Sequence, residues 1–282
     1  MGGTVYPLVL LALLVLALPA VAQDIIMVPV TVDGETVKLA IRIYKPTTDV
    51  PGPTLVFNHG STGRGTDPSI MVRPIDFPPL AQLFVGRGWA VVMPARRGRG
   101  GSDGQSDEGF APDRSAGYSC EPALSIPGAD RALRDMDAAM GAILAMPFVD
   151  RNRVVIGGQS RGGILSVAYA GQHPTQVKAV INFVGGWMGA RCVNASAINQ
   201  ALFTRGARYP GEVLWLYGDG DPFYPLSHSR ENFAAFKAAG GKGTFLEFSS
   251  PSGANGHQIV RYPDLWRPIV DDYLRRQGLG RP

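Results

Sequence analysis

Six short apolar runs, separated by longer segments with helical periodicity, constrain the fold of this chain most strongly. The runs are TLVFNHG (54–60), WAVVMPA (89–95), RVVIGG (153–158), KAVINFVGG (178–186), EVLWLYG (212–218) and GTFLEFS (243–249). Strands that alternate with helices pair in parallel, because each crossover helix packs on a face of the sheet. Helices are predicted within 74–88 and 128–146, directly after Ser160, over about 227–239, and within 265–278.

Two further strands are predicted ahead of these runs. The segment IIMVPVTVDGETVKLAIRIYKP (25–46) alternates apolar and polar residues around Asp33-Gly34, a dipeptide typical of a type I′ hairpin. With 45% hydrophobic residues the chain can bury a large core. We therefore predict a single α/β domain over 23–282, a doubly wound and mostly parallel sheet of about eight strands with helices on both faces. In such sheets ligands bind beyond the carboxyl ends of the strands.

The first 22 residues, MGGTVYPLVLLALLVLALPAVA, are typical of a secretory signal peptide. They carry no charged side chain, and an apolar run is followed by the small-residue triplet Ala20-Val21-Ala22. An apolar run of about a dozen residues is shorter than the roughly 20 that span a bilayer. The sequence therefore predicts cleavage and export to the periplasm or the medium, without a stable membrane span. An uncleaved anchor or a buried leading segment remain the alternatives.

Charge gives no indication of nucleic-acid binding. The net charge is only +4, and the basic residues are spread along the chain without a block of like charges. The run RRGRGG (96–101) occurs once, at the end of a predicted strand, which does not favour a nucleic-acid segment. We expect Arg96, Arg97 and Arg99 to hold this loop by hydrogen bonds or to contact an anionic group of a substrate.

The string Gly158-Gln159-Ser160-Arg161-Gly162 joins a predicted strand directly to a predicted helix. A glycine-rich loop could have this composition by chance, but a strand-turn-helix setting is what a nucleophile elbow requires. Ser160 is therefore the candidate nucleophile. The backbone N–H of Arg161 is one candidate donor to an oxyanion. The second is expected from NHGSTG (58–63), with Ser61 preferred and Thr62 behind it.

A serine nucleophile needs a histidine base that is oriented by an acid. Of the four histidines, His257 lies in the loop SSPSGANGHQIV, where the chain can reach the elbow. His173 and His228 fall on predicted helices, and His59 lies near the site at a strand end unsuited to a base. The acid is expected from LYGDGDPFYP (216–225). Asp221 precedes Pro222, which holds it in a turn, and is preferred to Asp219.

The order Ser160, Asp221, His257, the HG after the third strand and the GQSRGG elbow resemble the α/β-hydrolase fold. Within it the chain is similar to the dienelactone-hydrolase-like and prolyl-oligopeptidase-like branches, and the resemblance covers residues 25–277. Dienelactone hydrolases use a cysteine nucleophile, so their substrate is not carried over to this serine-containing elbow. The resemblance implies neither a metal nor an organic cofactor.

The long aperiodic connection 104–128 is expected to be functional or to cover the pocket, and the resemblance implies a cap over the pocket within 186–206. These two segments contain the only cysteines, Cys120 and Cys192, and an oxidising compartment would favour a disulfide over two buried thiols. Neither cysteine has a second ligand at zinc-site spacing. Candidate residues for substrate contact, each of which could instead be core or surface, are His59, Trp187, Met188, Phe223 and Tyr224.

The sequence as a whole predicts an exported serine hydrolase that cleaves a small-molecule carboxylic ester through an acyl-enzyme. Two alternatives stay open: a serine peptidase for short peptides, and a non-catalytic binding protein that keeps the fold. Acyl chain length and oligomeric state are left open by the sequence.

Overall fold

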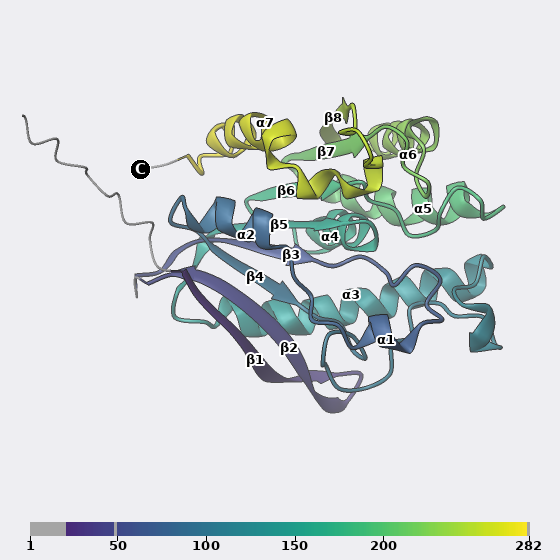
Figure 1. Cartoon of the computed structure of the whole chain (residues 1–282), viewed down its shortest axis with the longest axis horizontal. Coiled ribbons are helices and arrows are strands. Elements are labelled where there is room, and N and C mark those ends of the chain that lie inside the picture. The colour runs from purple at the N-terminus through teal and green to yellow at the C-terminus, as the bar shows by residue number, and fades with distance from the viewer. Residues whose placement is uncertain (1–20, 48–49, 281–282) are drawn as a thin grey trace, which may run out of the picture.

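The computed structural model describes residues 21–47 and 50–280. An eight-stranded sheet runs through it in the order β1-β2-β4-β3-β5-β6-β7-β8 (Figure 1). The strands are β1 (Val21–Val32), β2 (Glu35–Pro46), β3 (Gly52–Asn58), β4 (Ala90–Pro94), β5 (Val149–Gln159), β6 (Ala179–Phe183), β7 (Glu212–Gly218) and β8 (Lys242–Phe248). Only the β1–β2 and β2–β4 pairs are antiparallel. The predicted doubly wound, mostly parallel sheet is confirmed.

The proposed signal peptide, 1–22, lies outside the described residues except for Val21 and Ala22, which begin β1. The hairpin between β1 and β2 turns at Asp33 and Gly34, whose φ angles are 53° and 81°. Two consecutive positive φ angles are the signature of the type I′ turn that the sequence predicted. Within the described residues, no helix is both long enough and apolar enough to cross a membrane.

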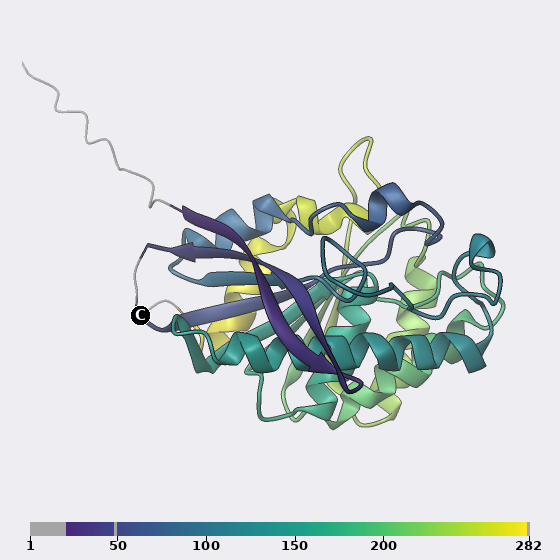
Figure 2. The same ribbon diagram turned by 90° about the horizontal axis from the view of Figure 1, so that it is seen from below.

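Helices cover both faces of the sheet (Figure 2). On one face α2 packs against α7, and on the other α3 packs against α4 and α5 against α6. The helices are α1 (Pro68–Met71), α2 (Pro78–Val85), α3 (Pro122–Leu144), α4 (Arg161–Gln172), α5 (Ala195–Phe203), α6 (Leu226–Ala238) and α7 (Pro263–Arg276). Short 3-10 helices are η1 (Arg114–Ala116), η2 (Thr204–Arg208) and η3 (Gly256–Arg261).

The two segments expected to be covering loops contain more helix than the sequence indicated. Helix α3 begins at Pro122, earlier than the predicted start at 128, with Pro127 inside it. Proline is well tolerated at the first helical position, so Pro122 can start the helix within the segment that was expected to be a covering loop. The segment 186–206 contains α5, whose buried residues recur at helical spacing: Ala195, Ile198, Asn199, Leu202 and Phe203.

Candidate active site

Ser160 lies between the end of β5 and the start of α4 with φ 58° and ψ −125°. A residue with a side chain rarely adopts this conformation, and it persists only where the surroundings impose it. Here a Cβ on Gly162 would lie 2.0 Å from the backbone oxygen of Asn58, and one on Gly158 would lie 2.5 Å from the carbonyl carbon of Gly162. Both glycines of the elbow are therefore sterically required, and the serine projects from a tight strand-to-helix turn.

The acid candidate Asp221 follows β7, and its side chain is fully buried although the turn around it is exposed. Its Oδ1 accepts hydrogen bonds from the backbone N–H groups of Phe223 and Tyr224, at 2.8 and 3.0 Å. Its Oδ2 lies 2.9 Å from Nδ1 of His257. Two amides thus fix one oxygen of the carboxylate, and the other is left to bind the imidazole.

Asp219, the alternative acid, faces away from the histidine. It accepts a hydrogen bond from the backbone N–H of Ser250 at 2.7 Å, an exposed contact that lowers its pKa. The structure therefore brings Asp221, and not Asp219, to His257.

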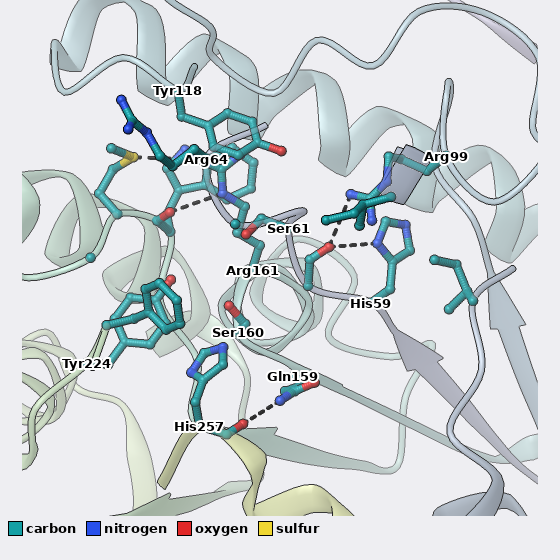
Figure 3. A pocket seen from close by; sticks show the side chains of 18 of the residues that line it. His59, Ser61, Arg64, Arg99, Tyr118, Gln159, Ser160, Arg161, Tyr224 and His257 are labelled. Carbon is teal, nitrogen blue, oxygen red and sulfur yellow. Dashed lines mark hydrogen bonds between the residues drawn. The ribbon is translucent and has the colours of Figure 1, made fainter. Parts of the chain in front are cut away.

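His257 lies in η3, directly after Gly256. The Asn255 side chain caps this turn by accepting from the His257 N–H at 3.0 Å, and Gln159 Nε2 donates to the His257 carbonyl oxygen. Figure 3 shows the imidazole directed at Ser160. Residues from β5, from the turn after β7 and from η3 thus meet at one end of the sheet, as its parallel topology requires.

The other histidines have different surroundings. His173 contacts Asp137 and stacks on Tyr169, and His228 bonds Asn199. His59 is buried, with Nδ1 2.8 Å from the Gly60 oxygen and Nε2 3.2 Å from the Arg96 backbone nitrogen. Nδ1 therefore carries the proton and donates, whereas Nε2 accepts. Burial lowers the pKa of His59 well below its ordinary value, and the charge of Arg96 lowers it further.

Two backbone N–H groups flank Ser160 without a partner among the described residues, those of Arg161 and Ser61. Arg161 is the first residue of α4, so its N–H is one of the free donors at a helix N-terminus. Ser61 follows Gly60, whose Cβ, if present, would lie 3.1 Å from the Ser160 Cβ. Thr62, the alternative donor, does not line the cavity beside Ser160, whereas Ser61 does, and the Thr62 hydroxyl lies 3.4 Å from that of Tyr118. Such donors can stabilise negative charge that forms beside the serine.

The side chain of Arg161 connects the elbow to both covering segments, which the sequence analysis did not foresee. Its guanidinium carbon lies 3.6 Å from the ring centre of Tyr118 and 4.0 Å from that of Trp187. It donates to the backbone oxygens of Trp187 and Glu108, at 3.1 and 3.0 Å. Beyond it a disulfide joins Cys120 to Cys192, as predicted, with their Cα atoms 5.6 Å apart.

A cavity of about 860 Å³ opens above Ser160 and His257. All five candidate contact residues line it, although Trp187, Met188 and Tyr224 are also largely buried and Phe223 is 40% exposed. Burial raises the pKa of Tyr224 to about 12, so its hydroxyl is protonated. The charged residues that line the cavity are Arg64, Arg73, Arg99, Arg161, Arg191 and Asp76. The cavity is therefore strongly electropositive.

The Asp76 carboxylate is not free to compensate the positive charge of these arginines. It accepts a hydrogen bond from the Tyr44 hydroxyl at 2.7 Å, and it lies 3.7 Å from the guanidinium of Arg42. Within 21–47 and 50–280, no three His, Cys, Asp or Glu side chains come together as a metal site would require.

Comparison with known proteins points to one family and one fold. Residues 33–209 match the sequence model of the family described as X-Pro dipeptidyl-peptidase (S15 family). The quorum-quenching protein AidA of Acinetobacter baumannii is 26% identical over 225 residues, which are 79% of this chain and 64% of that protein. The chain thus spans less than two thirds of the length of this curated relative.

Two solved structures illustrate the shared fold. Pyrococcus horikoshii acylaminoacyl peptidase aligns over 90% of this chain and 42% of its own, with 17% identity and a TM-score of 0.62. Est1E of Butyrivibrio proteoclasticus, solved with ferulic acid bound, aligns over 89% of this chain and 98% of its own, with 16% identity and a TM-score of 0.59. The resemblance to α/β-hydrolases is thereby confirmed.

Proposed function

Because this chain belongs to the X-Pro dipeptidyl-peptidase (S15) family and is a serine hydrolase, we propose that it cleaves carboxylic esters through an acyl-enzyme on Ser160. The observation that carries the proposal is the buried Asp221 carboxylate 2.9 Å from His257 Nδ1, with the imidazole directed at the serine. This arrangement supports a base that accepts a proton at Nε2 while Nδ1–H stays bonded to the acid.

In the proposed reaction His257 Nε2 removes the Ser160 proton as Oγ attacks the ester carbonyl carbon. The backbone N–H groups of Arg161 and Ser61 donate to the oxyanion that forms. The tetrahedral intermediate collapses when its bond to the alcohol oxygen breaks, and the imidazolium returns the proton to that oxygen. Water, deprotonated by the same histidine, then attacks the acyl-enzyme and releases the acid.

The charge of the cavity favours an ester over a free peptide. A peptide with an unblocked N-terminus carries an ammonium group, and a site for it needs a free carboxylate. The one described carboxylate on the wall, Asp76, is already bonded to Tyr44, whereas five arginines line the same space. Ester cleavage also makes less demand on protonation of the leaving group than amide cleavage.

We propose further that the protein is exported and that segments 104–128 and 186–206 act as a cover. The disulfide between Cys120 and Cys192 supports both points, because such bonds persist in oxidising compartments and this one joins the two segments beside the cavity. N-terminal sequencing of the protein recovered from an expressing cell should begin at Gln23. A mature chain that starts at Met1 contradicts cleavage.

A fluorophosphonate probe tests the catalytic proposal directly. Native protein should form an adduct at Ser160, located by peptide mass spectrometry, and His257→Ala should label far more slowly. An adduct elsewhere, or labelling that is unaffected by His257→Ala, would refute the mechanism. Turnover of p-nitrophenyl esters against aminoacyl p-nitroanilides on the same sample separates esterase from peptidase, with the esters expected to be the better substrates.

A further inference from the structure

Arg99 has a buried guanidinium to which the preceding sections assign no role. The residue is 4% exposed, yet it lines the cavity above Ser160. Its Nε has no hydrogen-bond partner among the described residues. The one side-chain bond described for it runs from Nη1 to the Gly60 oxygen at 3.4 Å, and that oxygen already accepts from His59 Nδ1 at 2.8 Å. Arg99 thus has N–H groups in excess.

The neighbouring charges do not neutralise it. Glu108 is the buried carboxylate of this cluster, and both of its oxygens are taken. Oε1 accepts from Arg96 Nε at 2.5 Å, and Oε2 lies 3.3 Å from Nη1 of Arg161. Burial would raise the pKa of Glu108, but Arg96 and Arg161 outweigh burial and hold it well below its ordinary range, so the carboxylate is ionised. Three guanidiniums therefore share one negative charge.

The other two arginines of the RRGRGG run have defined structural contacts. Arg96 donates to the His59 backbone oxygen at 2.9 Å as well as to Glu108, and Arg97 bonds Asp135 and Asp33. These contacts hold the loop after β4. Keeping a third buried guanidinium without a carboxylate partner is costly for folding. A ligand that supplies the missing anion would offset this cost.

The position of Arg99 relative to the nucleophile defines what such a ligand would look like. Figure 3 shows Arg99 beside His59, with its guanidinium bonded to the backbone oxygen of Gly60. The other side of Gly60 lies against Ser160, because a Cβ there would be 3.1 Å from the serine Cβ. One residue thus separates the guanidinium from the nucleophile. A group bound at Arg99 would therefore be only a few bonds from an ester carbonyl at Ser160.

We infer that Arg99 binds a carboxylate of the substrate, so that the preferred ester is a half-ester of a short dicarboxylic acid. This inference rests on the proposed esterase function and adds the substrate class to it. The planar fork of an arginine matches a carboxylate with two N–H groups, including the unpartnered Nε. The arginines of the cavity wall, Arg64, Arg73 and Arg191, would attract such an anion from solution.

Kinetics with matched substrates test the inference. The substrates are p-nitrophenyl half-esters of succinic, glutaric and adipic acid and their neutral methyl diesters, with spontaneous hydrolysis subtracted. Native enzyme should prefer one half-ester over its methyl diester by roughly 10-fold or more in kcat/KM, the size expected of hydrogen bonds between charged groups. Arg99→Met, which keeps the aliphatic part of the side chain but removes the guanidinium, should abolish this preference.

The ratio of kcat/KM for the two substrates is measured within each variant, so a general loss of stability or activity cancels. Arg134→Met is the matched control, because Arg134 is an exposed arginine that pairs with Asp33 away from the cavity. It should keep the native ratio. If Arg99→Met lowers kcat/KM equally for half-ester and diester, the arginine is structural and the inference is wrong. Arg99→Gln gives the same readout if the methionine variant does not fold.

Binding without turnover separates this inference from the proposed function. Monomethyl glutarate, titrated into Ser160→Ala by calorimetry, should bind at least 10-fold more tightly than dimethyl glutarate, and adding Arg99→Met should remove the difference. Equal affinity of the two esters for Ser160→Ala overturns the carboxylate site. Selective binding by Ser160→Ala, combined with no ester turnover by native protein, upholds the carboxylate site and refutes the esterase.

Discussion

The substitution Asp221→Asn removes the charge of the proposed acid and keeps its shape. The two backbone amides at Oδ1 can still be satisfied by the carbonyl oxygen of asparagine. The NH2 group then faces His257 Nδ1, which must accept a hydrogen bond instead of donating one. Nδ1 loses its proton in this arrangement, so the proton of the neutral ring moves to Nε2. That nitrogen can no longer take a proton from Ser160.

A histidine held in this unproductive tautomer lowers kcat about 10,000-fold in a Ser-His-Asp triad, which is equivalent to a loss of about 5 kcal/mol of transition-state stabilisation. We expect a loss of that order for Asp221→Asn with p-nitrophenyl acetate, with a thermal unfolding midpoint close to native. Asp219→Asn is the matched control, because Asp219 bonds Ser250 rather than the histidine. It should keep kcat within about threefold, which is under 1 kcal/mol. Equal losses in both variants, or less than tenfold loss in Asp221→Asn, would refute the assignment.

Three further predictions concern stability. Replacing both cysteines by serine should lower the free energy of unfolding by about 4 kcal/mol in urea titrations, since the disulfide closes a separation of 72 residues; an unchanged midpoint contradicts this. Burial and the charge of Arg96 hold the pKa of His59 well below 6.5, so protonation of this side chain favours the unfolded chain. The thermal unfolding midpoint should therefore fall as the pH drops below about 6.5, and it should fall less steeply in His59→Gln. Gly162→Ala should destabilise the protein by several kcal/mol, because the added methyl group would contact Asn58. Gly141→Ala, whose methyl group would enter open space in α3, should stabilise the protein by up to about 1 kcal/mol. Similar shifts in the two variants would argue against a steric requirement for glycine in the elbow.

The elements that the sequence predicted well are those whose signal is local. Each strand of the parallel sheet is a short run of apolar residues, and the hairpin is marked by Asp33-Gly34. The close contacts of the elbow allow only glycine at positions 158 and 162, so the elbow can be recognised in the sequence from the spacing of these two glycines around Ser160. The three proposed catalytic residues follow from strand order, because the carboxyl ends of parallel strands lie together.

The surroundings of the site depend on contacts between distant segments, and these were not predicted. The stripe of α5 was present in the sequence, yet the segment 186–206 was expected to be a covering loop. The sequence analysis predicted a role for the backbone of Arg161 but none for its side chain. Its partners Glu108 and Tyr118 lie about fifty residues earlier in the chain, in a segment without periodicity. Only the folded chain brings these residues together.

In the proposed mechanism, this arrangement of Arg161 would couple substrate selection to catalysis. Its backbone N–H is a proposed oxyanion donor, and its guanidinium is held between Tyr118 and Trp187, which belong to the two covering segments. A displacement of either covering segment would therefore shift Arg161, the residue next to the nucleophile. A change in the cover that only reshaped the cavity would alter KM alone. Because Arg161 connects cover and elbow, substitutions of Tyr118 or Trp187 should lower kcat as well, even for a small ester that does not reach them.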